Sequence, residues 1–222
     1  MKNTVQTGRI SGLYAITPDE AQTGSLLSMA RLALLGGARV LQYRNKAAGP
    51  ALRLEQARAL RELTREFSVA LLINDDAGLA QQVNADGVHL GSEDGSVAGA
   101  RTLLGDGKLI GVSCYNRLSL AHEAVRQGAD YVAFGSFFSS TVKPDAVPAS
   151  LDLLRQARRE LSIPLVAIGG ITAVNAPQLL FAGADALAVI SAVFAAADVR
   201  DAARQFSVLD YPEINKRPEI NQ

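Results

Sequence analysis

The chain has 222 residues, of which 48% are hydrophobic and 20% are charged, so it can bury a continuous core and is not expected to be disordered or fibrous. Lysine and arginine total 22, as do aspartate and glutamate, so the zero net charge gives no overall field that would favour nucleic acid or an acidic membrane surface. No apolar run is long enough to cross a bilayer, and the single cysteine, Cys114, excludes an internal disulfide.

Eight short β-branched or aliphatic runs alternate with longer segments of helical period, which is typical of parallel strands joined by helices. We predict strands at Leu13–Ile16, Val40–Tyr43, Ala70–Ile73, Gly87–Leu90, Leu109–Ser113, Tyr131–Phe134, Leu165–Ile168 and Ala186–Ile190. This count indicates an α/β chain that forms a single (β/α)8 TIM barrel, because 222 residues is near the lower size limit of that fold. An open, doubly wound sheet is the alternative.

The expected domain boundaries follow from this count. We predict one domain over residues 1–222, with the barrel at 12–206 and a C-terminal extension at 207–222. The segment Met1 to Ile10 lacks the apolar core of a signal peptide, so we expect a cytoplasmic protein. The sequence leaves open whether the chain forms a homo-oligomer.

A similar phrase introduces four of the predicted strands. We expect the glycine of this phrase to end the preceding helix in a left-handed conformation, and its alanine to permit a tight turn into the strand. The four copies are Gly37-Ala38-Arg39, Asn84-Ala85-Asp86, Gly128-Ala129-Asp130 and Gly183-Ala184-Asp185.

The second predicted strand ends in three side chains suited to an anion. Because side chains alternate along a strand, Gln42, Arg44 and Lys46 share one face, while Tyr43 and Asn45 share the other. Charges there would be costly inside the barrel but can meet an anion at its rim. The alternative is a solvated strand end with a surface ion pair.

The third and fourth strands each end in carboxylates. Asp75 and Asp94 would lie on neighbouring rims, and two carboxylates beside a phosphate site suit Mg²⁺. The alternative is that Asp76 and Asp94 cap the helices that follow, since aspartate is a favoured N-cap residue. We expect Asp76 to be such a cap and Glu93 to face solvent.

The loops after the sixth, seventh and eighth strands also favour phosphate. The segment 135–144 is rich in hydroxyls and contains Lys143. Gly169 and Gly170 let the backbone approach a ligand, and the eighth strand ends in Ile190-Ser191. We therefore expect two anion sites, one near strands two, five and six and the other near strands seven and eight.

Three further residues receive no catalytic role. His89, within a strand, is expected to be a hydrogen-bonded interior residue, and His122 to lie on a helix surface. Cys114 has no sequence neighbours that would mark it as a nucleophile, so we expect a small buried thiol.

Several phrases together resemble the thiamine-phosphate synthase family over residues 12–206. They are Leu13-Tyr14-Ala15-Ile16-Thr17, Gln42-Tyr43-Arg44-Asn45-Lys46, Ile73-Asn74-Asp75, Gly87-Val88-His89-Leu90-Gly91-Ser92-Glu93-Asp94, Gly111-Val112-Ser113, Phe134-Gly135, Lys143-Pro144 and Ala167-Ile168-Gly169-Gly170-Ile171. The resemblance implies a transferase that joins a pyrimidine diphosphate to a thiazole phosphate with Mg²⁺. Thiamine phosphate and pyrophosphate would be the products.

The resemblance also implies roles for individual residues. Arg44, Lys46, Ser113 and Lys143 would be catalytic and would surround the pyrimidine diphosphate with Gln42 and Asn74, while Asp75 and Asp94 would hold the metal. The thiazole phosphate would lie against Gly170, Ile190 and Ser191, with Ser140 as a further substrate-binding residue.

The chain departs from the family pattern at Val142, where a hydroxyl is usual, and at Ser92, where glutamine is usual. Two other functions therefore stay open: a thiazole tautomerase with the same barrel, and an inactive barrel that binds thiamine precursors. The carboxylates Asp75 and Asp94 argue against the tautomerase, which has no diphosphate leaving group to neutralise.

Overall fold

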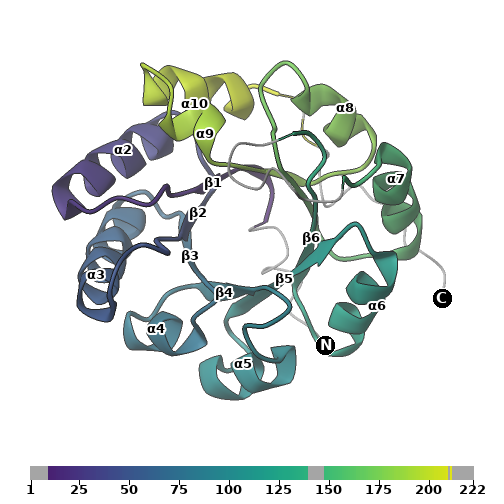
Figure 1. The fold of residues 1–222 in the computed structure, drawn as a ribbon, viewed down its shortest axis with the longest axis horizontal. Coiled ribbons are helices and arrows are strands. Elements are labelled where there is room, and N and C mark those ends of the chain that lie inside the picture. Colours follow the sequence, from purple (N-terminus) through teal and green to yellow (C-terminus); the bar gives the residue numbers. More distant parts are fainter. Residues whose placement is uncertain (1–9, 140–147, 210, 212–222) are drawn as a thin grey trace.

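Eight parallel strands form a closed barrel with helices around its outside (Figure 1). The computed structural model describes residues 10–139, 148–209 and 211. Each strand pairs with the next in chain order, and β8 pairs with β1 in parallel, so the predicted TIM barrel is confirmed and the open sheet is wrong. The strands are β1 (Gly12–Ile16), β2 (Val40–Tyr43), β3 (Ala70–Asn74), β4 (Gly87–Leu90), β5 (Leu109–Tyr115), β6 (Tyr131–Phe134), β7 (Leu165–Ile168) and β8 (Ala186–Val189).

The helices of the described residues follow the strands around the barrel (Figure 1). They are α2 (Thr23–Leu35), α3 (Pro50–Glu66), α4 (Ala77–Gln82), α5 (Val97–Leu104), α6 (Leu118–Arg126), α7 (Leu151–Glu160), α8 (Ala176–Phe181), α9 (Ser191–Phe194) and α10 (Val199–Ser207). None of the helices in this part of the chain is both long and apolar enough to cross a membrane.

Four predicted strand bounds differ from the structure. The first strand begins one residue earlier, at Gly12, and the third ends one residue later, at Asn74. The eighth strand stops at Val189, because the backbone of Ile190 leaves the extended conformation and precedes α9. The fifth strand continues past Ser113 to Tyr115, with a register irregularity where it pairs with β6. Of the predicted extension 207–222, Leu209 and Tyr211 are described beyond α10 and pack against the core.

The apolar core has two layers. The larger layer lies between strands and helices, and residues such as Leu41, Leu71 and Phe134 contribute to it. The smaller layer fills the barrel, with Val40, Leu72 and Val166 among its members. Period-two alternation along each strand divides the side chains between these layers.

The repeated phrase before the strands builds the amino-terminal end of the barrel. Gly37, Gly128 and Gly183 have positive φ, as predicted, and Asn84 adopts positive φ at the same place in the remaining copy. In three copies the following aspartate accepts a hydrogen bond from a backbone N–H of the preceding strand and pairs with an arginine. These sets are Leu71–Asp86–Arg61, Ile110–Asp130–Arg101 and Leu165–Asp185–Arg158.

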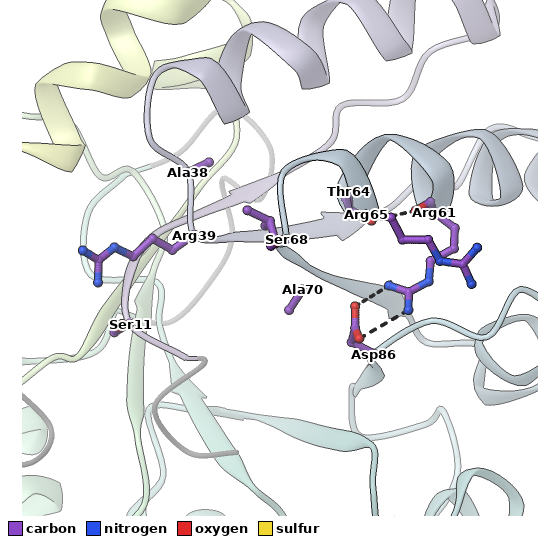
Figure 2. A pocket seen from close by; sticks show the side chains of 10 residues that line it. Ser11, Ala38, Arg39, Arg61, Thr64, Arg65, Ser68, Ala70 and Asp86 are labelled. Atoms are coloured by element: carbon purple, nitrogen blue, oxygen red, sulfur yellow. Dashed lines mark hydrogen bonds and ion pairs between the residues drawn. The ribbon is translucent and has the colours of Figure 1, made fainter. Parts of the chain in front are cut away.

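Figure 2 shows the Asp86–Arg61 ion pair of the first set at the edge of a cavity of about 490 Å³. Arg61 is held by Asp86 with an Nη1–Oδ2 distance of 2.5 Å, and Arg65 pairs with Glu62. Two of the arginines at this cavity thus serve ion pairs within the chain. This pattern indicates a stabilising role for the amino-terminal end of the barrel, at the opposite end from the strand termini that bear the predicted site.

Candidate active site

A cavity of about 1090 Å³ opens where the strands end, at the carboxyl-terminal end of the barrel. All predicted site residues that the structure describes line it: Gln42, Arg44, Lys46, Asn74, Asp75, Asp94, Ser113, Gly170, Ile190 and Ser191. The predicted residues Ser140 and Lys143, and the departure at Val142, lie outside the described residues. The structure therefore brings together residues from six strand ends that are far apart in the sequence.

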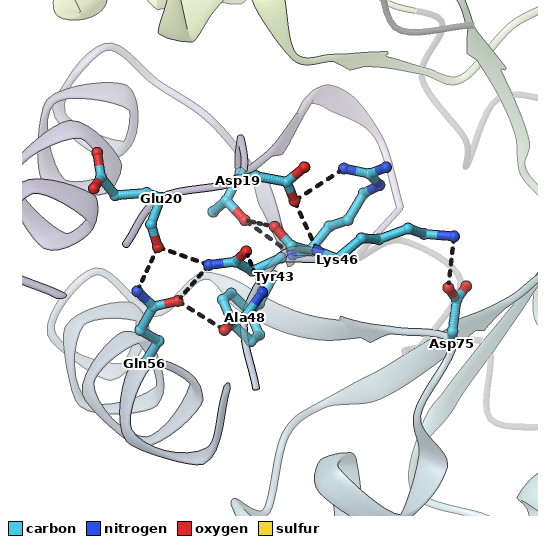
Figure 3. A network of polar contacts seen from close by, with 10 residues as sticks. Asp19, Glu20, Tyr43, Lys46, Ala48, Gln56 and Asp75 are labelled. Carbon is cyan, nitrogen blue, oxygen red and sulfur yellow. Dashed lines mark hydrogen bonds and ion pairs between the residues drawn. The ribbon is translucent and has the colours of Figure 1, made fainter. Parts of the chain in front are cut away.

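The alternation predicted at the end of β2 is present. Gln42, Arg44 and Lys46 line the cavity. Tyr43 and Asn45 point the other way, where both donate to Oε1 of Gln56 on α3, at 2.8 and 2.9 Å. This second set anchors the strand end to α3, so the cationic face is held toward the cavity (Figure 3).

Asp19, in the loop after β1, also organises this strand end. Its Oδ1 accepts the backbone N–H of Lys46 at 2.7 Å and lies 3.4 Å from Nη1 of Arg44 (Figure 3). The backbone N–H of Arg44 donates to Thr17 Oγ1 at 2.9 Å. The predicted ion pair therefore exists, but it is long, and Arg44 also lines the cavity.

Lys46 reaches across the cavity rim toward β3. Its Nζ lies 3.3 Å from Oδ2 of Asp75, and Figure 3 shows the side chain extended toward that carboxylate. The Lys46 side chain is 59% exposed, so the ammonium group is open to a ligand from solvent.

The two predicted metal-binding carboxylates meet at this rim. Asp94 Oδ2 accepts the backbone N–H of Gly91 at 2.8 Å, and its carboxyl group also contacts that of Asp75. The pKa of Asp94 is raised above its ordinary value, first by burial and then by the hydrogen bond and charge of Asp75. Two carboxylates in contact repel each other unless a proton or a cation lies between them.

The helix-capping alternative holds for Asp76 and fails for Asp94. Asp76 Oδ1 accepts the N–H of Leu79 at 2.8 Å and so caps α4, as predicted. The cap of α5 is Ser96, whose Oγ accepts the N–H of Gly99. Asp94 is therefore not needed to begin that helix.

The donor set at this rim fits a hard divalent cation. Magnesium in proteins is usually held by one or two carboxylates, with waters and substrate phosphate oxygens completing the octahedron. Across the residues that the structure describes, no group of three or more His, Cys, Asp or Glu side chains converges on one point. The Asp75–Asp94 pair matches the smaller carboxylate count of a Mg²⁺ site rather than an all-protein metal cage.

The other side of the cavity is formed by backbone-rich segments. Gly169 and Gly170 have φ values of +102° and +62°, and a side chain at Gly170 would collide with the carbonyl groups of Phe138 and Ser139. Asn175 Nδ2 donates to the Gly170 carbonyl at 3.0 Å and holds this turn. Only glycine fits here, and the backbone can approach a ligand closely.

Cys114 and the two histidines take the positions predicted for them. Cys114 is fully buried, and burial raises the pKa of its thiol to about 12. His122 forms a surface ion pair with Glu160. His89 lies inside the barrel, where its ring nitrogens contact Tyr131 and Ser113, each at 2.9 Å. None of these residues needs a catalytic role to explain its position.

The structure also adds residues that the sequence did not single out. Asp19 and Tyr115 act at the rim, and Tyr115 contacts Ser92 with an O–O distance of 3.1 Å. Tyr14 and Tyr131 contribute hydroxyl groups inside the barrel. Glu93, expected to face solvent, is exposed but stands at the cavity mouth. The alternation of β1 could have pointed to Tyr14, whereas the contacts of Asp19 depend on the path of a loop.

Comparison with known proteins adds an independent line of evidence. The family model described as "Thiamine monophosphate synthase" matches residues 13–193. A thiamine-phosphate synthase from Nitrosospira multiformis is 57% identical over 200 residues, which cover 90% of this chain and 86% of that protein. One from Methylobacillus flagellatus is 54% identical, covering 90% of this chain and 95% of that protein.

Comparison with solved structures supports the same family. Thiamine phosphate pyrophosphorylase from Pyrococcus furiosus superposes with a TM-score of 0.81 and 38% identity, covering 90% of this chain and 95% of that chain. A 3-hexulose-6-phosphate synthase structure, at 20% identity and a TM-score of 0.67, shares the fold alone. The relatives favour neither a tautomerase nor an inactive barrel. The chain therefore belongs to the thiamine monophosphate synthase family, as the resemblance of its motifs implied.

Proposed function

We propose that this thiamine-phosphate synthase is a Mg²⁺-dependent transferase that joins a pyrimidine diphosphate to a thiazole phosphate. Thiamine phosphate and pyrophosphate are the products. The observation that carries the proposal is the division of one cavity into two sides. Cations and a carboxylate pair stand at the ends of β2, β3 and β4, and glycine-rich backbone stands at the ends of β7 and β8.

Asp75 and Asp94 are the residues that would hold the metal, because their carboxyl groups meet at the rim beside Lys46. Bound there, Mg²⁺ would supply positive charge to the diphosphate oxygens of the substrate. Lys46 lies against Asp75 from the other side, so the chain places a cation next to the same diphosphate position.

Arg44 and Lys46 then serve as the groups that neutralise the departing pyrophosphate. Both reach the cavity from the end of β2, and the contacts of Asp19 fix the backbone that carries them. Lys143 is proposed to add a third positive charge from the loop after β6. Gln42, Asn74 and Ser113, from β2, β3 and β5, orient the pyrimidine diphosphate by hydrogen bonds.

The thiazole phosphate is proposed to bind across the cavity. Gly170 offers backbone without a side chain, and Ile190 and Ser191 line the wall beside it. Ser140 is a further proposed contact. This arrangement would hold the thiazole nitrogen in line with the pyrimidine methylene carbon.

We infer a dissociative substitution, in which the carbon–oxygen bond to pyrophosphate breaks before the thiazole nitrogen attacks. The cavity wall is rich in groups that stabilise a leaving anion. Cys114, the one cysteine of the chain, is fully buried and its thiol stays protonated, so it does not provide a nucleophile for a covalent route. The cytoplasmic location stays a prediction.

The test is release of pyrophosphate from the purified protein with both substrates, with and without Mg²⁺. We expect release only when both substrates and Mg²⁺ are present, in step with formation of thiamine phosphate. A protein that isomerises the thiazole substrate alone would instead be a tautomerase. Tight binding of both substrates with no turnover would indicate an inactive precursor-binding barrel.

A further inference from the structure

Five polar side chains form one continuous hydrogen-bonded chain through the inside of the barrel. Gln42 Nε2 lies 2.6 Å from the hydroxyl of Tyr14, which lies 2.9 Å from that of Tyr131. Tyr131 contacts His89 Nδ1 at 2.9 Å, and His89 Nε2 contacts Ser113 Oγ at 2.9 Å. The two ends, Gln42 and Ser113, line the cavity and are both proposed substrate-binding residues.

The middle of this chain is buried in an otherwise apolar layer. Tyr14 and Tyr131 are 1% and 0% exposed, and their neighbours in the barrel interior include Val40, Leu72 and Val166. Burial raises the pKa of both phenols, so both hydroxyl groups keep their protons. Four polar contacts through an apolar layer would be costly unless every donor had an acceptor.

That requirement fixes the direction of each hydrogen bond. An amide nitrogen can only donate, so Tyr14 accepts from Gln42. Within the described residues, the other hydrogen-bond partner of the Tyr14 hydroxyl is Tyr131, so the Tyr14 proton is donated there. Tyr131 then donates its own proton to Nδ1 of the next member, His89.

The direction continues to the far end. A neutral imidazole that accepts at Nδ1 carries its proton at Nε2, so His89 donates to Ser113 Oγ. Ser113 therefore acts as acceptor toward His89, and its own hydroxyl proton is left to point into the cavity. A serine hydroxyl held in this way is a donor, which is the role that a diphosphate oxygen requires.

We infer that Tyr14, Tyr131 and His89 are positioning residues that fix the hydrogen-bonding directions of Gln42 and Ser113 toward the pyrimidine diphosphate. This inference rests on the proposed function for the identity of that ligand. The hydrogen-bonded series connects two walls of the cavity. The orientation of the Gln42 amide on β2 and that of the Ser113 hydroxyl on β5 are therefore set together.

The backbone makes room for this arrangement. Gly111 on β5 is the register partner of Tyr131 on β6, and a side-chain carbon at Gly111 would overlap the Tyr131 ring. The φ of Gly111 does not lie in the left-handed region, so conformational freedom is not the reason for glycine here. The missing side chain is what allows the Tyr131 ring to lie across the barrel and meet His89.

The first test is kinetic and uses a matched pair of variants. Tyr131→Phe removes one hydroxyl from the hydrogen-bonded series, whereas Thr64→Val removes a buried hydroxyl that donates to the Arg61 carbonyl on α3, beside the cavity at the amino-terminal end of the barrel. We expect kcat/KM for the pyrimidine diphosphate to fall about 2- to 12-fold in Tyr131→Phe, the range of one neutral hydrogen bond, with the KM for the thiazole phosphate unchanged. Thr64→Val should match the parent.

A double-mutant cycle then asks whether Tyr131 acts through Ser113. Ser113→Ala alone should lower kcat/KM about tenfold or more, because it removes a donor to a charged group. In the Ser113→Ala background, Tyr131→Phe should cost less than about twofold. Full additivity of the two losses, or equal losses in Tyr131→Phe and Thr64→Val, would overturn the inference.

The second test reads the direction of the chain without substrate. The protein has two histidines, so ¹⁵N spectra of a His-labelled sample contain two imidazoles, and His122→Gln assigns them. We expect neutral His89 with its proton at Nε2, and a loss of this fixed tautomer in Tyr131→Phe. A proton at Nδ1 in the parent would mean that the chain runs in the opposite direction, and it would refute the inference.

These two readouts separate failure of the inference from failure of the proposed function. If the parent protein releases no pyrophosphate, the proposed function fails, while the imidazole spectra still decide the direction of the chain. If the parent is active and neither the cycle nor the spectra respond to Tyr131→Phe, the positioning role alone is wrong.

Discussion

Replacing Asp94 with asparagine should preserve or raise the stability of the metal-free protein but lower its affinity for Mg²⁺. Asparagine keeps the shape of the side chain, and its Oδ1 can still accept the Gly91 N–H that now donates to Asp94 at 2.8 Å. The replacement also removes one of the two carboxylates that meet at the rim. The metal-free variant should therefore be at least as stable as the parent, while its affinity for Mg²⁺ should fall.

The size of the effect follows from the loss of one carboxylate ligand. Groups that only support a metal ligand are worth about 10- to 100-fold in affinity, so removal of a ligand itself should cost at least that much. At a Mg²⁺ concentration about 100 times the dissociation constant of the parent, binding stabilises the parent by about 2.7 kcal/mol. If Asp94→Asn binds Mg²⁺ about 10- to 100-fold more weakly, binding at the same concentration stabilises the variant by only about 1.4 to 0.4 kcal/mol.

The assay is a pair of Mg²⁺ titrations on parent and variant, one of thermal unfolding and one of pyrophosphate release at saturating substrates. Activity of Asp94→Asn should fall at low Mg²⁺ and partly return at high Mg²⁺. The matched control is Asp76→Asn, which alters the cap of α4 at the neighbouring strand end. If Asp94→Asn requires no more Mg²⁺ than the parent, Asp94 is not a metal ligand, and its contact with Gly91 is purely structural.

Four further outcomes are expected. Because the pKa of Asp94 is raised in the folded chain, its protonated form favours folding, and this contribution is lost as the pH rises through that pKa. The affinity for Mg²⁺ should increase as the pH rises through the same pKa, because the carboxylate form binds the cation. Mg²⁺ titrations at several pH values should show this increase in affinity in the parent but not in Asp94→Asn. Asp185→Ala should lower the free energy of unfolding by about 3–5 kcal/mol in urea melts, because it removes the ion-pair partner of Arg158 and the acceptor of the Leu165 N–H. The control Asp152→Ala should lower it by under about 1 kcal/mol, because the ion pair of Asp152 with Arg155 is exposed. Cys114→Ser should retain activity, and the parent thiol should resist iodoacetamide at neutral pH, because burial raises its pKa to about 12; rapid alkylation with loss of activity would contradict this. A pyrimidine diphosphate with a strongly electron-withdrawing group in place of its methyl should react much more slowly in single-turnover experiments, and an unchanged rate would favour direct displacement by the thiazole nitrogen.

The fold could be predicted from the sequence because the signals that specify it are local. Runs such as Leu71-Leu72-Ile73 are buried on both faces, so a short apolar stretch marks a strand without any long-range information. Strand ends were less predictable. Ile190 is apolar and follows an apolar run, yet its backbone turns away from the sheet to begin α9, which the residue type does not indicate.

The site residues at the strand ends could also be placed from the sequence. Period-two alternation along β2 puts Arg44 and Lys46 on the cavity side, and the parallel order of strands puts Asp75 near Asp94. The contacts that orient these residues could not be predicted. Asp19 reaches the backbone of Lys46 from a loop, and Tyr14 meets Tyr131 from the other side of the barrel, so both contacts depend on the three-dimensional path of the closed sheet.

The two ends of the barrel use the same residue types for different purposes. At the amino-terminal end, Asp86, Asp130 and Asp185 each pair with an arginine and accept a backbone N–H, so their charges are balanced within the chain. At the other end, the carboxyl groups of Asp75 and Asp94 contact each other, and the nearby cation, Lys46, is largely exposed to solvent. A carboxylate pair left short of positive charge costs folding free energy unless a cation binds. The asymmetry therefore supports the proposal that the reaction takes place at the carboxyl ends of the strands, where a metal and a diphosphate would balance the remaining charge.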